Sequence, residues 1–395
     1  MKAGRQWLVC GRGTGLPDYV PGAICVNFCK VAGSPCSSEE PLLHLSAVAA
    51  NNTVPMNSRT TAALRVLKFC RYFLVVAVFA TPLFSETCFT SDDMDAPSRS
   101  AIQAAAMKFF DMVARGDSAS LKQNSIPAVA GDFGWIEATI RDNQPNLAGA
   151  HATARPSFML KVEGAAPLEK AEFLCGVFGA NGLTPNSTEF IIPNLPPGTY
   201  AAIILDIAGQ KAPVTLSFVL EQKGTDWKLG GFFLRDTQIA GHNSDWFLDR
   251  ARAFKSKGQT HAAWLYFFEG RELTMPVPFM YTQLTDKLFD EAQTVKPADF
   301  PMNGNAVDLS SPDGKTYKVT SLFPTTVDQQ LHLIVKFQTA SVADSGQAFQ
   351  ECMAVMKALL VKFPELRDAF DGIVARAVEP SGKDYGALMK MKDIK

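Results

Sequence analysis

The sequence predicts an α+β protein whose helices and strands occupy successive regions of the chain. An apolar stripe at helical spacing begins near residue 98, and side chains alternate with a period of two from residue 157 onward. A pair of amphipathic helices follows, and a second set of strands accompanies a long helix near the C-terminus. We therefore expect an α+β domain over 98–236, a helical hairpin linker over 237–295 and a C-terminal α+β domain over 300–395.

The segment before these domains has the features of an export signal. An apolar run at 72–84 follows a stretch at 59–71 that carries several Lys and Arg side chains. The run of about 13 residues is shorter than the roughly 20 that a helix needs to cross a bilayer. We interpret residues 56–85 as a signal peptide or N-terminal anchor. We expect translation to start at Met56 and residues 1–55 to lie outside the folded product.

Several outcomes of this signal stay open. Cleavage after Ala80 and cleavage after Ser85 are both compatible with the sequence. Without cleavage, the run at 72–84 would anchor the protein in the inner membrane, and Cys88 is a weak candidate for lipid attachment. A buried core strand is the remaining interpretation, and the basic residues upstream disfavour it. We expect an exported protein, periplasmic or extracellular, that meets a membrane only through an uncleaved signal.

Composition indicates a globular chain without a strong electrostatic field. Hydrophobic residues make up 47% of the sequence and charged residues 19%, and the net charge is -1. No nucleic-acid partner is therefore expected. Cys88, Cys175 and Cys352 are the cysteines that follow the signal, and an odd number at wide spacing is not a disulfide framework. One bridge is compatible with an oxidising compartment, and Cys352 lies on the apolar face of a helix, as a core residue would.

The first domain begins with predicted helices. Polar residues at 86–97 are typical of a linker, and Ser98 or Ser100 is placed to cap the helix that follows. A second short helix is predicted over 118–123. Gly, Asn and Pro recur between 127 and 156, which predicts a loop-rich stretch.

Strands dominate the rest of the first domain. They are predicted at 158–162, 172–178, 190–192, 200–207, 214–222 and 227–234. Pro197 and Gly198 supply a tight turn, and Gly224-Thr225-Asp226 predicts a hairpin between the last two strands.

Helices followed by a meander that ends in WKLGGFFLR, at 227–235, resemble the cone-shaped NTF2-like fold over residues 98–236. The resemblance implies a curved sheet around a pocket, which some members use for isomerase, dehydratase or hydrolase chemistry and others only for binding or dimerisation. The turn PNLPPGTY, at 193–200, is instead similar to small extracellular β-sandwich modules. A sandwich over 157–235 therefore stays open beside the cone.

The second half of the chain is predicted with clearer periodicity. Helices capped by Ser244 and Thr260 form a hairpin that ends before Pro276, and a short helix follows at 281–292. The C-terminal domain is expected to contain strands at 306–310, 315–322, 331–338 and 373–378, with a helix that begins at Ser345 and ends before Pro364. His332 falls on the polar side of its strand, so we expect it to be solvated.

Residues 56–395 resemble uncharacterised exported proteins of acidobacterial type. The comparable hairpin, the helical pair and the segment PELRDAF, at 364–370, occur in the same order. This resemblance implies an architecture and export from the cytoplasm. It implies no activity and no site residue.

Candidate chemistry is confined to a group of charged residues in the first domain. Asp206 and Glu221 are the candidate bases, and Asp226 and Arg235 lie near them on the last hairpin. A carboxylate inside an NTF2-like pocket would have its pKa raised by burial and would serve as a general base. The competing interpretation is a strand-end carboxylate that faces solvent or pairs with Arg235. No motif predicts a cofactor or a metal site.

These observations favour an exported binding or envelope-assembly protein without catalytic activity, whose partner is a protein or a small apolar ligand. The alternative is a small-molecule enzyme of the isomerase or hydrolase type that uses the pocket. Two observations separate the hypotheses: whether the cone is hollow, and whether Trp264 and Phe268 face solvent or another domain.

Overall fold

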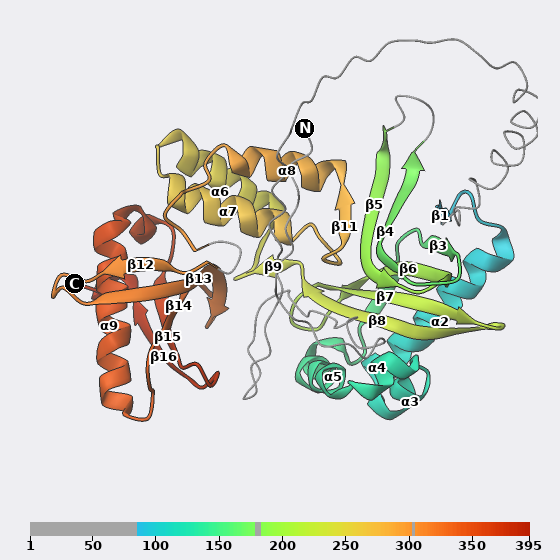
Figure 1. The fold of residues 1–395 in the computed structure, drawn as a ribbon, viewed down its shortest axis with the longest axis horizontal. Helices are drawn as coiled ribbons and strands as arrows, with labels where there is room; N and C mark the ends of the chain where they lie inside the picture. The colour runs from blue at the N-terminus through green and yellow to red at the C-terminus, as the bar shows by residue number, and fades with distance from the viewer. Residues whose placement is uncertain (1–84, 178–182, 302–304) are drawn as a thin grey trace, which may run out of the picture.

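A computed structural model describes residues 85–177, 183–301 and 305–395, which form an N-terminal and a C-terminal lobe that lie side by side (Figure 1). Helices and mostly antiparallel sheets occur in both lobes, so the predicted α+β class is confirmed. Residues 1–55 and the apolar run at 72–84 lie outside the described residues.

Helices follow the first strand of the N-terminal lobe and cover one face of its sheet. Their bounds are α2 (Ala96–Ala114), α3 (Ser118–Gln123), α4 (Pro127–Gly131) and α5 (Gly134–Leu147). The cap of α2 is Asp95, whose carboxylate accepts a hydrogen bond from the backbone N–H of Ser98 at 2.7 Å. The prediction that Ser98 or Ser100 caps this helix is therefore wrong, whereas the short helix at 118–123 is confirmed.

The predicted loop-rich stretch at 127–156 is also wrong, because it contains α4, α5 and a strand. Pro127 occupies the first turn of α4, where a missing backbone N–H costs no hydrogen bond. Ile136 and Ile140 bury one side of α5 against the lobe core. Burial of that side outweighs the turn-forming residues around it.

The main sheet of the N-terminal lobe is antiparallel, with strand order β1-β3-β6-β7-β8 and β2 also paired to β6. Its strands are β1 (Ser85–Phe89), β2 (His151–Ala154), β3 (Phe158–Glu163), β6 (Gly198–Ala208), β7 (Val214–Lys223) and β8 (Asp226–Asp236). The predicted β7–β8 hairpin is confirmed. Residues 86–97, predicted to be a linker, instead contain most of β1, which pairs with β3 from Ser85 to Phe89.

A second sheet covers the other face of the main sheet. It has the order β11-β5-β4, and its strands are β4 (Leu168–Val177), β5 (Leu183–Leu195) and β11 (Met280–Thr282). Phe173 and Phe190 from this sheet share a core with Ile204 and Phe233 of the main sheet. The tight turn after β5 therefore carries the chain from one sheet to the other.

A short hairpin and a set of helices connect the lobes. Their bounds are β9 (Gln238–Ile239), β10 (His242–Asn243), α6 (Ser244–Ser256), α7 (Thr260–Glu272) and α8 (Gln283–Gln293). Ala240 and Gly241 form the turn between β9 and β10, both with positive φ. The α6–α7 pair shares one hydrophobic core with the C-terminal sheet, so it is part of that lobe rather than a free linker.

The C-terminal lobe is a sheet with α9 on one face (Figure 1). Its elements are β12 (Val307–Ser310), β13 (Thr316–Val327), β14 (Gln330–Gln338), α9 (Ser345–Lys362), η1 (Pro364–Asp368), β15 (Gly372–Val378), β16 (Asp384–Lys390) and η2 (Met391–Asp393). The strands follow the order β12-β13-β14-β15-β16. α9 is the crossover between β14 and β15, which are parallel.

His332 corrects a prediction in this lobe. Its strand was expected to alternate between buried and solvated side chains, but His332 is 2% exposed. Its ring lies against Gly372 of the neighbouring strand, where an added Cβ would come within 2.8 Å of the ring. The ring Nδ1 lies 3.1 Å from the carbonyl oxygen of Gln330. Both faces of the strand are therefore buried at this point, which a pattern with a period of two does not reveal.

Candidate functional site

Asp206, the first candidate base, lies on the surface in an ion pair. Its carboxylate oxygens accept hydrogen bonds from Arg155 Nε at 2.9 Å and Nη2 at 2.6 Å. Half of the Asp206 side chain is exposed. The partner is Arg155 and not Arg235, the partner that the sequence suggested. A half-exposed carboxylate whose two oxygens are both bound to one guanidinium does not lie in the apolar pocket that a buried general base would need.

Glu221, the second candidate base, lies at the opposite end of the same sheet. It faces Tyr200 across β6 and β7 and forms an ion pair with Lys223. Burial, and then the Glu221 carboxylate, raise the pKa of Tyr200, whose hydroxyl donates to the carbonyl oxygen of Pro196 at 2.9 Å. Tyr200 and Asp206 are six positions apart along β6, which separates the two candidates by roughly 20 Å. The structure does not bring them together.

Side chains fill the space between the helices and the main sheet. Phe109 of α2 packs edge-on against Phe218 of β7, with ring centroids 5.9 Å apart. Trp135 of α5 makes the same kind of contact with Phe232 of β8 at 6.2 Å. Phe109, Phe218 and Phe232 are all at most 1% exposed. The predicted pocket would lie between these two layers, and aromatic packing occupies that position.

The sequence left open whether Trp264 and Phe268 face solvent or another domain. Trp264 packs against the core of the C-terminal lobe, whereas Phe268 is 39% exposed. Phe289 of α8 is also exposed, and the guanidinium carbon of Arg271 lies 5.6 Å from the centre of its ring. Trp264 therefore packs within the C-terminal lobe, and Phe268 is partly exposed to solvent.

A cluster of charged side chains lies where α7 meets the end of β8, and no sequence motif predicted its central residue, Glu269. Glu269 of α7 is 8% exposed and accepts no hydrogen bond from the residues that the structure describes. Arg235 of β8 donates to Glu272 Oε2 from Nη2 at 3.1 Å. Arg271 donates to the other oxygen of Glu272 at 3.3 Å. We call Arg235, Asp236, Glu269, Arg271 and Glu272 the seam cluster.

Burial dominates the titration of Glu269. It raises the pKa of this carboxyl group to about 8, with a further increase from the negative charges of Glu272 and Asp236 and a decrease from Arg235. Glu269 is therefore mostly a neutral acid at pH 7. A charged residue within the apolar run of α7, AAWLYFFEG, was the available signal for this site. Helical periodicity alone did not show that the neighbouring face was also buried.

A second cluster joins α7 to the C-terminal lobe. His261 Nδ1 lies 2.6 Å from Glu365 Oε1, and Nε2 lies 3.0 Å from Asp299 Oδ1. His261 therefore bridges Glu365 and Asp299 through its two ring nitrogens. The hollow beside it, lined in part by Asp299 and Lys362, has space on the order of a single water molecule.

We predict that His261→Gln lowers the free energy of unfolding by about 1–2 kcal/mol, because at least one of the two carboxylates loses its contact with the ring. Urea denaturation measures the change. His242→Gln is the matched control: His242 stacks on Trp246 with ring centroids 3.7 Å apart, and its replacement should change stability by less than about 0.5 kcal/mol. Equal stability of the two variants would contradict the bridging role of His261.

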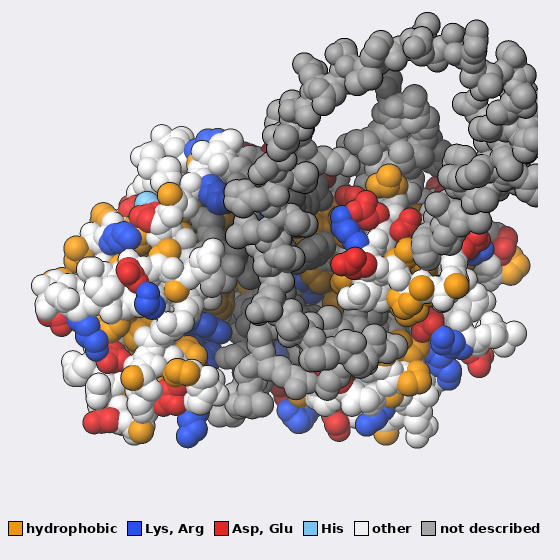
Figure 2. Space-filling model, in the orientation of Figure 1, with side chains coloured by type: hydrophobic (Ala, Val, Ile, Leu, Met, Phe, Trp, Pro, Cys, Tyr) orange, Lys and Arg blue, Asp and Glu red, His pale blue; other side chains and the backbone are white. Residues whose placement is uncertain are grey.

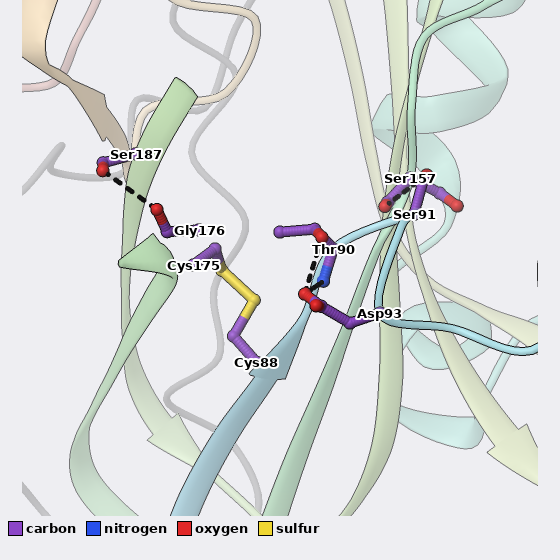
Figure 3. Close-up of a disulfide and its surroundings, with 8 residues drawn as sticks. All are labelled: Cys88, Thr90, Ser91, Asp93, Ser157, Cys175, Gly176 and Ser187. Atoms are coloured by element: carbon purple, nitrogen blue, oxygen red, sulfur yellow. Dashed lines mark hydrogen bonds between the residues drawn. A yellow bond between two sulfur atoms is a disulfide. The ribbon is translucent and has the colours of Figure 1, made fainter. Parts of the chain in front are cut away.

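A disulfide joins the two sheets of the N-terminal lobe (Figure 3). Cys88 of β1 bonds to Cys175 of β4, with the Cα atoms 5.2 Å apart. Beside it, Asp93 accepts hydrogen bonds from the backbone N–H and hydroxyl of Thr90, and Ser91 donates to the carbonyl oxygen of Ser157 at 3.0 Å. Cys352 is buried with a free thiol, as the sequence predicted.

No family model, no curated protein and no solved structure matches the chain. None of the helices in the described residues combines the length and apolar character needed to span a bilayer. Within 85–177, 183–301 and 305–395, no group of three or more Cys, His, Asp or Glu side chains is arranged to hold a metal ion. On the visible described surface, charges of both signs are interspersed (Figure 2).

Proposed function

We propose that this chain is an exported protein that binds a partner or assists envelope assembly without catalysing a reaction. The observation that carries the proposal is the disulfide between Cys88 and Cys175. Structural disulfides persist in oxidising compartments and are rare in the cytosol. This bridge lies only a few residues after the predicted signal, so export would deliver the strand that contains Cys88 directly to the compartment where the bond forms.

The disulfide also helps to decide whether Cys88 is lipid-modified and where the signal peptide is cleaved. A cysteine whose sulfur is bonded to Cys175 has no thiol left for a lipid, which disfavours lipid attachment at Cys88. Cleavage after Ser85 would remove the first residue of β1, which pairs with Glu163, whereas cleavage after Ala80 would leave the whole strand in the product. We therefore favour cleavage after Ala80.

The N-terminal sequence of the protein recovered from its native envelope fraction tests the proposal. We expect the chain to begin at Thr81 and to show no free thiol at Cys88 when it is labelled under denaturing conditions without reductant. A full-length chain in the cytosol with a reactive Cys88 would contradict the proposal. A chain that begins at Glu86 would keep export but overturn the preferred cleavage position.

The alternative of a small-molecule enzyme lacks a supporting observation. It would require Asp206 or Glu221 beside a space for substrate, and both carboxylates are engaged in ion pairs at opposite ends of the sheet. Turnover of a small substrate that is lost in Asp206→Asn would restore this alternative. The NTF2-like cone remains a proposal for residues 98–236: helices on one face of the sheet support it, whereas the second sheet on the other face favours the sandwich.

A further inference from the structure

The two lobes meet at the C-terminal end of α7, and we call this interface the seam. After this helix the chain enters the N-terminal lobe, where Phe279 joins the core between the sheets and packs on Phe233 with ring centroids 5.3 Å apart. β11 then pairs with β5, from Met280 opposite Phe190. On the other side, Gly270 of α7 packs closely on Leu248 of α6, within the C-terminal lobe. Glu269 therefore occupies the turn of helix at which the two cores meet.

Charged side chains from two elements surround Glu269. The strand β8 contributes Arg235 and Asp236, and α7 contributes Arg271 and Glu272. Glu272 already accepts hydrogen bonds from both arginines. Ionised, Glu269 would be a third negative charge, buried and without a hydrogen-bond donor among the described residues. An uncompensated buried charge of this kind is strongly destabilising.

The helix α6 meets this position through uncharged groups. α6 meets Gly270 through the side chains of Phe247 and Leu248, and the Ser244 hydroxyl donates to the carbonyl oxygen of Gly270 at 2.6 Å. Arg271 also donates to the carbonyl oxygen of Thr285, at 3.0 Å, which fixes its position. Both arginines of the cluster are therefore already engaged, and α8, which also packs on α7, carries the charged residues Asp286, Lys287, Asp290 and Glu291.

We propose that Glu269 is a proton-operated latch between the lobes, closed while its carboxyl group is neutral and weakened when that group ionises. Opening would let water and counter-ions reach the carboxylate. The latch is independent of the proposed export, because it follows from the position of Glu269 between two packed cores and from the charges that face it.

The direction of the pH dependence follows from linkage. The pKa of Glu269 is about 8 in the closed state, above the ordinary value of 4.5. Neutral Glu269 therefore makes its full contribution to the stability of the closed seam below about pH 4.5. This contribution decreases as the pH rises and does not decrease further above about pH 8. If opening exposes Glu269 fully, the equilibrium constant for opening should increase about tenfold for each pH unit between the two pKa values.

Amide hydrogen exchange of the whole protein between pH 5 and pH 8 tests the latch, with rates corrected for the intrinsic pH dependence of exchange and β14 as internal reference. In the wild type, we expect protection of the segments 232–239 and 268–282 to fall with rising pH. In Glu269→Gln, whose side chain stays neutral, protection should be independent of pH. Glu291→Gln is the matched control, since Glu291 of α8 pairs with Arg252 and its pKa is lowered, mainly by that hydrogen bond; it should respond like the wild type.

Two results would overturn the latch: a wild-type seam whose protection does not change over this range, or a Glu269→Gln seam that loses protection as the wild type does. The wild-type measurement decides even where Glu269→Gln fails to fold, and Glu269→Leu provides a second neutral side chain of similar size. A pH response confined to segments outside the seam would also contradict the proposal.

Discussion

Replacing both bridging cysteines, in Cys88→Ala/Cys175→Ala, should lower the free energy of unfolding by about 4 kcal/mol. The bond closes a loop with a sequence separation of 87, so it removes a large amount of chain entropy from the unfolded state. It also holds β1, which lies at the edge of the main sheet, against β4 of the second sheet. Denaturation in urea, monitored by circular dichroism, measures the loss.

Reduction provides the control for this prediction. Addition of reductant should bring the wild type close to the stability of the double variant and leave the double variant unchanged, because Cys352 forms no bond in either protein. A double variant as stable as the oxidised wild type would show that the two sheets hold together without the bond. A reductant effect in the double variant would show that another thiol is responsible.

Tyr266→Ala should cost about 4 kcal/mol and is the largest effect that we expect from a single core substitution in the C-terminal lobe. The ring is 1% exposed and lies 5.0 Å from the ring of Phe254 and 5.7 Å from that of Phe370, centroid to centroid. The hydroxyl donates to the carbonyl oxygen of Ala369. This side chain therefore joins the helical hairpin to the segment that follows α9.

Tyr266→Phe separates the ring from the hydroxyl. It keeps the packing and leaves the carbonyl of Ala369 without this donor, so it should cost only about 1 kcal/mol. Because α6, α7 and the C-terminal sheet share one core, we expect both variants to shift a single unfolding transition of that lobe. Separate transitions for the hairpin and the sheet would contradict the assignment of the hairpin to the C-terminal lobe.

The segment PELRDAF shows why this assignment was not visible in the sequence. Within it, Glu365 contacts His261, Asp368 accepts a hydrogen bond from Gln259, and Ala369 and Phe370 contact Tyr266. All of these partners lie about a hundred residues earlier in the chain. The sequence showed the order of the helical pair and this segment, but it carried no information on which groups meet.

Local signals predicted the elements whose residues pair with near neighbours. The β7–β8 hairpin follows from Gly224 and Asp226 at its turn, and α3 follows from its short polar run after Gly116. Edge strand β1 and helix α5 were not predicted, because each is stabilised by burial against distant strands rather than by its own propensity.

The candidate site residues also depend on contacts that the sequence alone does not predict. Asp206 and Glu221 were selected for their residue type, and their distance along the sheet became clear only from the pairing of β6 with β7. Glu269 lacked any motif, since its unusual environment is created by Arg235 and Asp236 at the end of β8 and by the core of the other lobe. Burial from two sides is a property of the fold, and a single helix does not encode it.

The central claim is that the chain is exported and contains a disulfide that joins the two sheets. The most direct test is intact mass spectrometry of the protein purified from its native host. The proposal predicts a chain that begins at Thr81 and whose mass is lower by two hydrogen atoms than after reduction, with the bond mapped to Cys88 and Cys175. A chain that retains residues 56–80 and has the same mass before and after reduction would contradict it.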